Sequence, residues 1–547
     1  MTIEIGRTRI GDVVENNAKS LGDRIALAYH EYGLQRTFSE FSDECNQVAK
    51  GLMALGVQRG DHIAFWSHNL PEWVYTQFGS AKMGAVMVTV NTNFRAFELE
   101  YLLQQSDATT LILTGGVRDP EEYIKVVYEV CPELKESRPG QLQSDKIPYL
   151  KNVVYLGEER LPGMYTWKDM LEMGRKIGDW ELRTREDSLD PDDVIMMQYT
   201  SGTTGYPKGV MLTHSNLLGN ASSMAEIMAL SPEDTLCIPV PFFHCFGCVI
   251  GTMCSVVSGT TMAPVTSFTA PKVLETIDAL QCTAVHGVPT MFIAEFEEME
   301  KKSYDTSHLR TGVMAGSTCP VEVMRGVIDT MGAEEMTIVY GQTEASPGIT
   351  QTRRNDSLQV RTETVGRALP NVEVKVVDQD TKEGLPPGET GELISRGYHI
   401  MKGYYKMPEK TREVIDSDGW LYTGDLAVMD EEGNCTIVGR LKDMIIRGGE
   451  NIYPREIEEF LYTHPRIKDA QVVGLPSQKY GEEVAAFIQL KEDGNADEEE
   501  IRDFCRGQIA YYKIPEYIDF VEEFPTTASG KVQKYKLREQ FNAWHLQ

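Results

Sequence analysis

One segment carries most of the information in this chain: Tyr199-Thr200-Ser201-Gly202-Thr203-Thr204-Gly205-Tyr206-Pro207-Lys208-Gly209. It follows Val194-Ile195-Met196-Met197-Gln198, a short apolar run typical of a buried strand. Glycines allow close approach of the backbone, and successive N–H groups in such a turn form an anion-binding concavity. The hydroxyls and the lysine add further donors. The segment therefore predicts a binding loop for a phosphate-rich ligand.

This loop differs from the Walker phosphate loop, G-x-x-x-x-G-K-[ST], which opens directly into a helix. Here Lys208 is followed by Gly209-Val210-Met211-Leu212, which is typical of a second strand. The next helix starts later, with Ser215 as its expected N-cap. We therefore expect a loop that joins two strands and closes over phosphate as a mobile flap. A cluster of glycine, serine and threonine alone would favour a flexible polar hairpin turn, but the attached Pro207-Lys208-Gly209 and the segments described below favour the phosphate loop.

The chain on either side of this loop alternates helical and strand patterns. Before it, residues 41–52 have the spacing of an amphipathic helix, and residues 62–66 and 85–90 read as strands. This alternation indicates an α/β domain with mostly parallel sheets and flanking helices. Residues 115–165 are polar and irregular, so we expect a surface excursion there.

Three further strands are expected after the loop, at residues 283–286, 312–315 and 337–340, and a glycine follows each one. These glycines are Gly287, Gly316 and Gly341. In parallel sheets ligands bind beyond the carboxyl ends of the strands. A core glycine would explain any one of them, but the three together suggest a shared crevice.

The pattern changes at about residue 360. Residues 372–376 and 391–394 alternate with period two, as half-exposed antiparallel strands do. A small β-subdomain is therefore expected over about 360–440, within an N-terminal domain of residues 1–440. Residues 441–547 then form a smaller α/β C-terminal domain, with the boundary at Leu441–Lys442.

Acidic residues outnumber basic ones by 82 to 53, a formal net charge of −29. Nucleic acids and anionic membranes bind basic faces, so neither is an expected partner. Ten cysteines in so long a chain indicate a reducing compartment. The N-terminus has no apolar signal segment, and the apolar stretch 236–265 is interrupted by prolines and glycines. We expect a cytoplasmic protein without a membrane span.

Four other short segments carry side chains that could bind ligands or take part in catalysis. Each alone is a common turn or a solvated charge, so each alone favours a structural role. They are Tyr340-Gly341-Gln342-Thr343-Glu344, Thr423-Gly424-Asp425, Gly439-Arg440-Leu441-Lys442-Asp443 and Ser529-Gly530-Lys531.

Together with the phosphate loop, these segments resemble the adenylate-forming superfamily in order and spacing. That superfamily comprises acyl-CoA synthetases, luciferases and carrier-protein-loading adenylation domains. The resemblance runs from about residue 10 to about residue 540 and is strongest to the medium-chain acyl-CoA synthetases. It implies an acid–thiol ligase that forms an acyl-adenylate and diphosphate from a carboxylic acid and ATP. The acyl group then passes to coenzyme A, and AMP leaves.

The resemblance assigns the nucleotide site. The β- and γ-phosphates should be held by Thr200, Ser201, Gly202, Thr203, Thr204, Gly205 and Lys208. Mg²⁺, a hard ion that prefers oxygen ligands, should be held in part by Thr200 and Glu344. Adenine should lie between the Gly316-Ser317-Thr318 turn and Tyr340, which Gly341 and Gln342 follow.

The remaining nucleotide contacts and the second half-reaction are also assigned by resemblance. Thr343 should contact the α-phosphate, Asp425 the ribose hydroxyls with Arg440 beside it, and Lys531 both the α-phosphate and the substrate carboxylate. Lys442 occupies the hinge position at which the family's C-terminal domain rotates after adenylation. The rotation should bring the loop that binds coenzyme A into place, namely Arg447, Gly448, Gly449 and Glu450.

By resemblance, the acyl pocket is lined by Phe243, His244, Cys245, Phe246, Val285, Gly287, Gly316 and Gly341. No aspartate is present near Phe243 to pair with an amine, which disfavours an amino acid. Related acetyl-CoA synthetases carry tryptophan at the position of Gly341, so glycine favours a medium-chain, alicyclic or branched acid. A short acid such as acetate stays open. His244 either gates the tunnel or is a hydrogen-bonded core histidine.

Cys245 and Cys248 form a C-x-x-C motif, and we interpret them as small apolar residues rather than as a redox pair or half of a zinc site. The alternatives to a coenzyme A ligase are an enzyme that loads a carrier-protein thiol and a non-catalytic nucleotide-binding protein. The direction of the reaction and a homodimer are both left open by the sequence.

Overall fold

The computed structural model describes residues 3–116, 119–200, 207–316, 319–447, 450–477, 479–491, 494–506, 508–509, 511–526 and 532–545. Two compact units divide the chain. The first contains residues 1–373 and 396–421, and the second contains residues 374–395 and 422–547. The second unit takes in most of the predicted β-subdomain together with the C-terminal part. The predicted domain boundary at Leu441–Lys442 concerns a rotation and stays a prediction.

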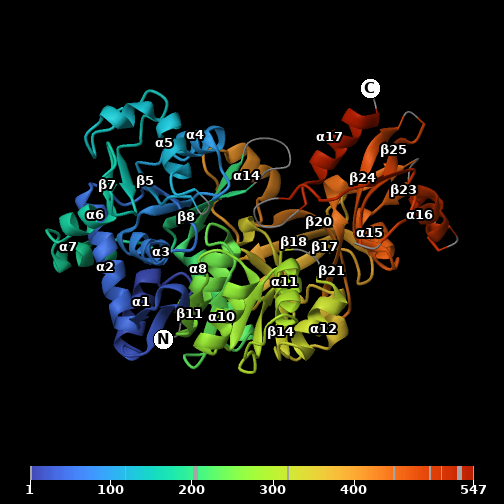
Figure 1. The fold of residues 1–547 in the computed structure, drawn as a ribbon, viewed down its shortest axis with the longest axis horizontal. Coiled ribbons are helices and arrows are strands. Elements are labelled where there is room, and N and C mark those ends of the chain that lie inside the picture. Colours follow the sequence, from blue (N-terminus) through green and yellow to red (C-terminus); the bar gives the residue numbers. More distant parts are fainter. Residues whose placement is uncertain are drawn as a thin grey trace. The chain divides into compact units, whose positions relative to one another are not determined.

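The first unit is built on two large sheets, coloured blue to yellow in Figure 1. One has the strand order β16 (Arg367–Ala368), β15 (Gly348–Gln351), β14 (Glu335–Gly341), β13 (Thr311–Met314), β12 (Ala284–Gly287), β10 (Thr235–Ile238), β11 (Thr261–Pro264), β1 (Ile25–Tyr29) and β2 (Leu34–Thr37). Its strands from β14 to β1 run parallel, as predicted.

The second sheet of this unit has the strand order β19 (Gly403–Tyr404), β9 (Lys208–Thr213), β8 (Val194–Thr200), β4 (Val86–Thr89), β3 (His62–Trp66), β5 (Thr110–Leu113), β6 (Asn152–Tyr155) and β7 (Tyr165–Thr166). Strands β8 to β7 are parallel, whereas β9 and β19 add to the edge in antiparallel pairs. An α/β class with mostly parallel sheets is therefore confirmed.

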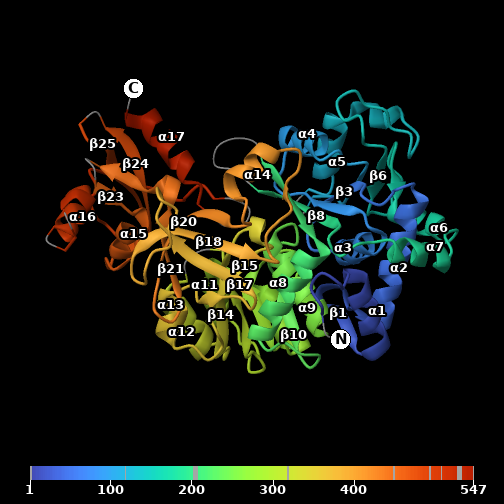
Figure 2. The same cartoon turned by 180° about the vertical axis from the view of Figure 1, so that it is seen from behind.

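Helices cover both faces of these sheets. They are α1 (Ile10–Ser20), α2 (Phe38–Ala54), α3 (Pro71–Met83), α4 (Ala96–Gln105), α5 (Glu122–Val130), α6 (Trp167–Gly174), α7 (Asp179–Asp187), α8 (His214–Ile227), α9 (Cys254–Ser258), α10 (Ala270–Leu280), α11 (Pro289–Met299), α12 (Val321–Asp329), α13 (Leu358–Glu363) and α14 (Pro408–Val414). Figure 1 shows α10, α11 and α12 on one side of the nine-stranded sheet. Figure 2, which views the molecule from behind, shows α8 and α9 on the other side. Among helices in the described ranges, none has the length and apolar composition needed to cross a membrane.

Local sequence explains these elements. Helix α2 begins after Thr37, whose side chain accepts from the Glu40 N–H while the Glu40 carboxylate accepts from Thr37 in return. Its apolar stripe, including Phe41 and Leu52, is buried as the spacing predicts. The predicted cap of α8 was wrong by two residues. Thr213 is the N-cap and accepts from the Asn216 N–H at 3.1 Å, whereas Ser215 donates to the Pro191 carbonyl.

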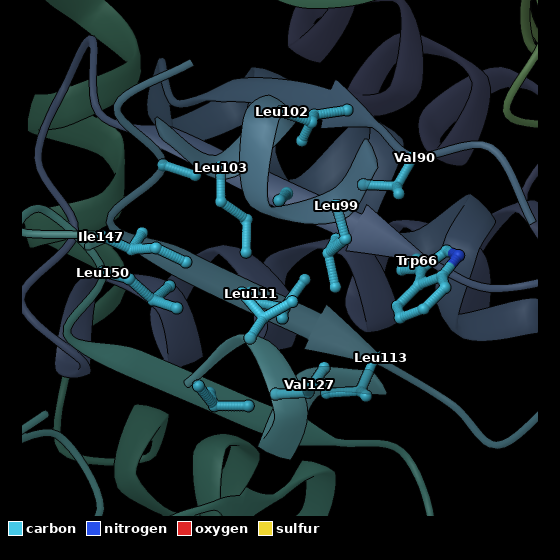
Figure 3. Close-up of a cluster of buried hydrophobic side chains, with 14 of the residues drawn as sticks. Trp66, Val90, Leu99, Leu102, Leu103, Leu111, Leu113, Val127, Ile147 and Leu150 are labelled. Carbon is cyan, nitrogen blue, oxygen red and sulfur yellow. The ribbon is translucent and has the colours of Figure 1, made fainter. Parts of the chain in front are cut away.

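The prediction of a surface excursion over residues 115–165 was also wrong. This segment forms α5, β6 and β7, and its apolar side chains complete a core under the eight-stranded sheet. Figure 3 shows Val127, Ile147 and Leu150 from this segment packed against Leu99, Leu103 and Leu111. The helical spacing of Tyr123, Val126 and Val127 could have predicted the buried helix, but long polar stretches surround these residues.

The second unit contains two smaller sheets, and three of its helices lie in the described part. One sheet has the order β17 (Val372–Val377), β18 (Thr390–Gly397), β20 (Leu421–Met429) and β21 (Cys435–Arg440). The other has the order β23 (Glu450–Ile452), β22 (Ile445–Arg447), β25 (Gly481–Leu490) and β24 (Ile467–Ser477), with β26 (Tyr517–Phe520) paired to β25. Its core packs against α15 (Pro454–Tyr462), α16 (Glu498–Cys505) and α17 (Lys534–His545).

Candidate active site

The predicted phosphate loop is the connection of a β-hairpin. Strands β8 and β9 pair antiparallel up to Thr200 and Lys208, so the loop joins two strands, as predicted. Residues Ser201, Gly202, Thr203, Thr204 and Gly205 lie outside the described residues. The described ends of the hairpin bring the Thr200 hydroxyl and the Lys208 ammonium to the two sides of that loop.

Side chains from two distant segments brace the hairpin. From α4, the Tyr101 hydroxyl donates to the Pro207 carbonyl at 3.0 Å, and Gln105 accepts from the Tyr199 hydroxyl. Gln105 also donates to the Tyr405 carbonyl at 2.8 Å, and the Tyr405 N–H donates to the Gly209 carbonyl at 2.8 Å. The base of the loop is thereby held by the sheet edge and by a helix together.

A second loop carries Thr343 and Glu344 beyond the carboxyl end of β14. These two residues form a short 3₁₀ turn over Thr343–Ala345. The turn is fixed by Asn220 of α8, which donates to the Gly348 carbonyl at 2.8 Å and accepts from the Gly348 N–H at 2.9 Å. The Glu344 carbonyl in turn accepts from the Met401 N–H at 3.0 Å. Glu344 thus has a defined backbone position.

Tyr404 joins the hairpin to the Glu344 loop. Its hydroxyl donates to Glu344 Oε1 at 2.7 Å, and the Lys208 ammonium lies 4.2 Å from the centre of its ring. Burial first, and Glu344 second, raise the pKa of this phenol above its ordinary value of 10. The structure therefore brings two of the predicted site residues, Lys208 and Glu344, together around Tyr404, and a third, Thr200, lies opposite Lys208 in the hairpin.

The donor set fits the magnesium ion that the fold implies. Thr200 Oγ1 is buried and has no hydrogen-bond partner among the described residues. A buried polar atom left without a partner is costly, which points to a group that binds it. A hydroxyl and a carboxylate are oxygen donors, the type that Mg²⁺ prefers. Thr200 and Glu344 are thus suited to share an ion with substrate phosphates.

The predicted crevice glycines lie at the same edge of the nine-stranded sheet. Strands β12, β13 and β14 are parallel neighbours, with Gly287, Gly316 and Gly341 at or just beyond their carboxyl ends. The backbone and the neighbouring side chains also explain why glycine is required at each of these positions. Gly316 has φ +92°, and a Cβ at Gly287 would lie 2.8 Å from the Phe292 ring. Ser317 and Thr318 lie outside the described residues.

Gly341 is the most constrained of the three. A Cβ built there would lie 1.8 Å from the Pro347 carbonyl oxygen, closer than any side chain tolerates. The Gln342 N–H donates to the same carbonyl at 3.0 Å. Tyr340, one residue earlier on β14, is half-buried and pairs with Thr350 of β15. With this backbone, position 341 has no room for a side chain of any size.

The predicted acyl-pocket residues divide into two groups. Phe243 and His244 are half-buried beyond the carboxyl end of β10, and Phe246 begins a buried π-helix over Phe246–Met253. The Phe246 ring centre lies 5.7 Å from that of His286. Val285, by contrast, is buried in the apolar cluster formed with α10, α11 and α12. The structure thus brings Phe246 to His286 and leaves Val285 in the core.

Two histidines near this site serve as hydrogen-bonding groups. His244 Nδ1 accepts from the Phe246 N–H at 3.1 Å, at the start of the π-helix. His286 Nδ1 accepts from the Val313 N–H at 3.1 Å, so its Nε2 donates to the Ile250 carbonyl at 3.0 Å. Complete burial lowers the pKa of His286 to about 4, and this ring is therefore neutral at physiological pH.

The C-x-x-C cysteines are buried thiols. Cys245 Sγ lies 4.0 Å from Thr343 Oγ1, and burial raises the pKa of Cys245 to about 12. Cys248 Sγ accepts from the Gln198 side chain at 2.8 Å. Within the described residues no cluster of three His, Cys, Asp or Glu side chains is arranged to hold a metal. All ten cysteines of the chain are free and buried.

The second unit holds the other predicted site residues. Asp425 and Arg440 face each other across β20 and β21, with Arg440 Nε 3.4 Å from Asp425 Oδ1. Lys442 lies in a 3₁₀ turn over Leu441–Asp443. Arg447 pairs with Glu483, and Glu450 follows on β23. Gly448, Gly449 and Lys531 lie outside the described residues.

Sequence reasoning did not single out Tyr404, Asn220 or Gln105. The signals for Asn220 were present, because Asn216, Asn220 and Ser223 share one face of an otherwise apolar helix at i, i+4 and i+7. For Tyr404 no comparable signal exists. It is one of two adjacent tyrosines at a two-residue strand, β19, and the two side chains that it contacts lie 60 or more residues away in sequence.

A glycine- and hydroxyl-rich hairpin connection that ends in a lysine, with a carboxylate beyond the end of a parallel strand, is typical of a nucleotide-binding enzyme. The chain belongs to the AMP-binding enzyme family, whose model matches residues 14–405, and the model of that family's C-terminal domain matches residues 456–531. Membership of the adenylate-forming superfamily is therefore confirmed.

Many relatives match, and two of those that cover nearly the whole chain illustrate the family. YngI of Bacillus subtilis (strain 168), whose name provisionally describes an acyl-CoA synthetase, is 55% identical over 98% of this chain and 98% of its own. The mitochondrial medium-chain acyl-CoA ligase ACSF2 of Danio rerio is 42% identical over 95% of this chain and 86% of its own.

Solved structures agree on the fold. ATP-bound MatB from Rhodopseudomonas palustris superposes with a TM-score of 0.81 at 26% identity, over 98% of this chain and 99% of that one. The anthranilate CoA ligase AuaEII, in complex with anthranoyl-AMP, superposes with a TM-score of 0.83 at 27% identity, over 98% of both chains.

Proposed function

We propose that this protein is an AMP-forming acyl-CoA synthetase, which converts a carboxylic acid, ATP and coenzyme A to an acyl-CoA, AMP and diphosphate. The observation that carries the proposal is the geometry at the hairpin. Tyr404 contacts both the Lys208 ammonium and the Glu344 carboxylate, and Thr200, whose hydroxyl has no partner among the described residues, lies opposite Lys208 in the hairpin of a chain that matches both AMP-binding enzyme models. The names of the two relatives support the same reaction.

In the first half-reaction a carboxylate oxygen attacks the α-phosphorus of ATP, and the bond from that phosphorus to diphosphate breaks. Two anions must approach each other, so cations have to neutralise the charge that builds up. Lys208 supplies one cation at the leaving diphosphate, and Lys531 a second at the α-phosphate. Mg²⁺ held through Thr200 and Glu344 would neutralise further phosphate charge. Thr343 orients the α-phosphate from the neighbouring turn.

In the second half-reaction the sulfur of coenzyme A attacks the acyl carbonyl carbon. The bond from that carbon to the AMP oxygen breaks, and the thiol proton is released. Rotation of the C-terminal domain at Lys442 withdraws Lys531 and presents Arg447 and the glycines after it. Arg447 is suited to this role because its paired guanidinium, 4.3 Å from the Tyr480 ring, has a set orientation.

The favoured substrate is a medium-chain, alicyclic or branched acid. Phe246, one of the residues assigned to the acyl pocket, forms an aromatic pair with the neutral His286, and each buried methylene is worth about 0.8 kcal/mol. An apolar acyl tunnel would therefore rank acids by length. The relative from Danio rerio is named for medium-chain acids. Acetate is the short-chain alternative.

The proposal is tested with purified protein and a panel of carboxylic acids from short to long. We expect acid-dependent exchange of pyrophosphate into ATP, and AMP release that requires coenzyme A, with the highest kcat/KM for medium-chain acids. Exchange without thioester formation from free coenzyme A would indicate a carrier-protein thiol as the acceptor. Absence of exchange with every acid would indicate a non-catalytic nucleotide-binding protein.

A further inference from the structure

Tyr404 occupies a buried edge position next to the phosphate hairpin. It belongs to the two-residue strand β19, which pairs antiparallel with β9, Tyr404 opposite Val210. Its side chain is 4% exposed, and its N–H donates to Thr411 Oγ1 at 2.9 Å. The residue is thus fixed from the sheet on one side and from the start of α14 on the other.

The side chain of Tyr404 touches two charged groups that come from different parts of the chain. The hydroxyl donates to Glu344 Oε1 at 2.7 Å, a charge-assisted bond stronger than a neutral one. The ring face accepts the Lys208 ammonium at 4.2 Å, within the range of a cation–π contact. Among the described residues Lys208 forms no ion pair with a carboxylate, and the Tyr404 ring is a stabilising contact for its charge.

We propose that Tyr404 is a positioning residue for the adenylation half-reaction, holding the Lys208 cation and the Glu344 carboxylate at a set separation around the phosphates. The inference rests on the proposed function. Both contacts leave these groups able to bind a ligand. The ring face leaves ammonium hydrogens of Lys208 for hydrogen bonds to phosphate, and the Tyr404 hydroxyl occupies one lone pair of the Glu344 carboxylate. A tyrosine supplies both contacts from one rigid ring.

Two substitutions separate the contacts. Tyr404→Phe keeps the ring and its contact with Lys208 but removes the hydroxyl from Glu344. Tyr404→Leu removes both. Tyr405→Phe is the matched control, because the neighbouring hydroxyl donates instead to Asp107 at 2.9 Å. All three variants keep the β19 backbone, and their Tm values show whether the fold is retained.

The first readout is ATP binding by calorimetry, with and without Mg²⁺ and with no acid present. For Tyr404→Phe we expect the gain in ATP affinity that Mg²⁺ brings to fall by about tenfold, the worth of one hydrogen bond to a charged group. Affinity for ATP without Mg²⁺ should match the wild type. For Tyr404→Leu both affinities should fall, and for Tyr405→Phe neither should change.

The second readout is acid-dependent pyrophosphate exchange at varied Mg²⁺ concentration. Tyr404→Phe should need about tenfold more Mg²⁺ for its half-maximal rate, with an unchanged KM for the acid. An unchanged or lower Mg²⁺ requirement in a folded Tyr404→Phe variant would overturn the inference, since the hydroxyl would then be only a core contact or a competitor of the ion. A wild-type protein that neither binds ATP nor exchanges pyrophosphate would instead overturn the proposed function itself.

Discussion

Glu295 of α11 is a carboxyl group in an environment that does not suit its charge. Its side chain has no exposed surface, and neither carboxylate oxygen has a hydrogen-bond partner among the described residues. Burial raises the pKa of this group from 4.5 to about 8. In the folded protein at neutral pH Glu295 therefore carries a proton that the unfolded chain releases.

Replacing Glu295 with glutamine should raise the stability of the protein, and by more as the pH increases. Between pH 4.5 and pH 8 the unfolded state binds fewer protons at this site than the folded state. The free energy of unfolding of the wild type should consequently fall with rising pH, by up to about 1.4 kcal/mol per unit. Glutamine does not ionise, so Glu295→Gln removes that slope. Tm values measured across this pH range provide the test.

The control for this prediction is Glu297→Gln, the same chemical change on the exposed face of the same helix. It should leave the pH dependence of Tm as in the wild type. Curves for Glu295→Gln that run parallel to the wild type would show that Glu295 ionises freely in the folded protein, against its burial.

Helix α8 positions two loops of the site at once. From its buried polar face, Asn220 binds the loop that follows Glu344, and Asn216 donates to the Tyr398 and Ile400 carbonyls at 2.6 and 3.0 Å. The segment after Ile400 leads into Tyr404. A helix that begins directly after β9 therefore aligns the carboxylate, the tyrosine and the phosphate hairpin relative to one another.

Replacing Asn220 with alanine should impair adenylation more than thioester formation. The Gly348 N–H and carbonyl would lose their partner in a buried position, and each such group costs about 1–3 kcal/mol. The Thr343–Glu344 turn should relax, lowering kcat/KM for ATP in pyrophosphate exchange by about 10- to 100-fold. Thioester formation from supplied acyl-adenylate should change less.

The matched control on α8 is Ser222→Ala, since the Ser222 hydroxyl has no hydrogen-bond partner among the described residues. This variant should behave as wild type in both assays. Equal losses in both half-reactions for Asn220→Ala, accompanied by a lower Tm, would mean that Asn220 only stabilises the fold.

At the scale of the whole molecule, the proposed mechanism assigns the two half-reactions to different residues of the C-terminal region. Lys531 is proposed to act in adenylation, and the loop containing Gly449 in thioester formation. Lys442, the proposed hinge, lies in a 3₁₀ turn directly after β21, and the next residue, Asp443, pairs with Arg538 of α17 at 3.2 Å. The chain itself and this ion pair therefore connect the turn to the C-terminal domain, which is proposed to rotate.

Two substitutions should give opposite results. Lys531→Ala should reduce acyl-adenylate formation by about 10²–10³-fold, the typical effect of losing one preorganised charge-stabilising group. It should largely spare thioester formation from supplied acyl-adenylate. Gly449→Val should do the reverse, because a side chain would obstruct the thin pantetheine chain. Pyrophosphate exchange and thioester release measure the two steps separately.

Lys536→Ala is the control for Lys531→Ala, because Lys536 is an exposed lysine on α17 whose ammonium lies 6.0 Å from the Tyr535 ring centre. It should leave both steps unchanged. If Lys531→Ala and Gly449→Val each slowed both half-reactions equally, the assignment of separate residues to separate steps would be refuted.

The local pattern of apolar and polar residues was sufficient to predict the structural elements that depend only on residues near one another in sequence. The apolar run before Thr200 and the strand after Lys208 form the predicted hairpin, and glycines at three strand ends share one sheet edge because parallel neighbours align their carboxyl ends. The period-two strands after residue 360 form a separate sheet. Alternation of apolar residues determines these elements directly, since each buries its own face.

Tertiary structure decided what depends on residues far apart in sequence. Ile147 and Leu150 are core residues in a segment that leads into β6, which pairs with β5, and the polar sequence around them does not show it. Likewise Tyr404 contacts Lys208 and Glu344 only because β19 adds to the edge of β9. Strand pairing joins segments almost 200 residues apart, and no local periodicity encodes which edge a short strand will join.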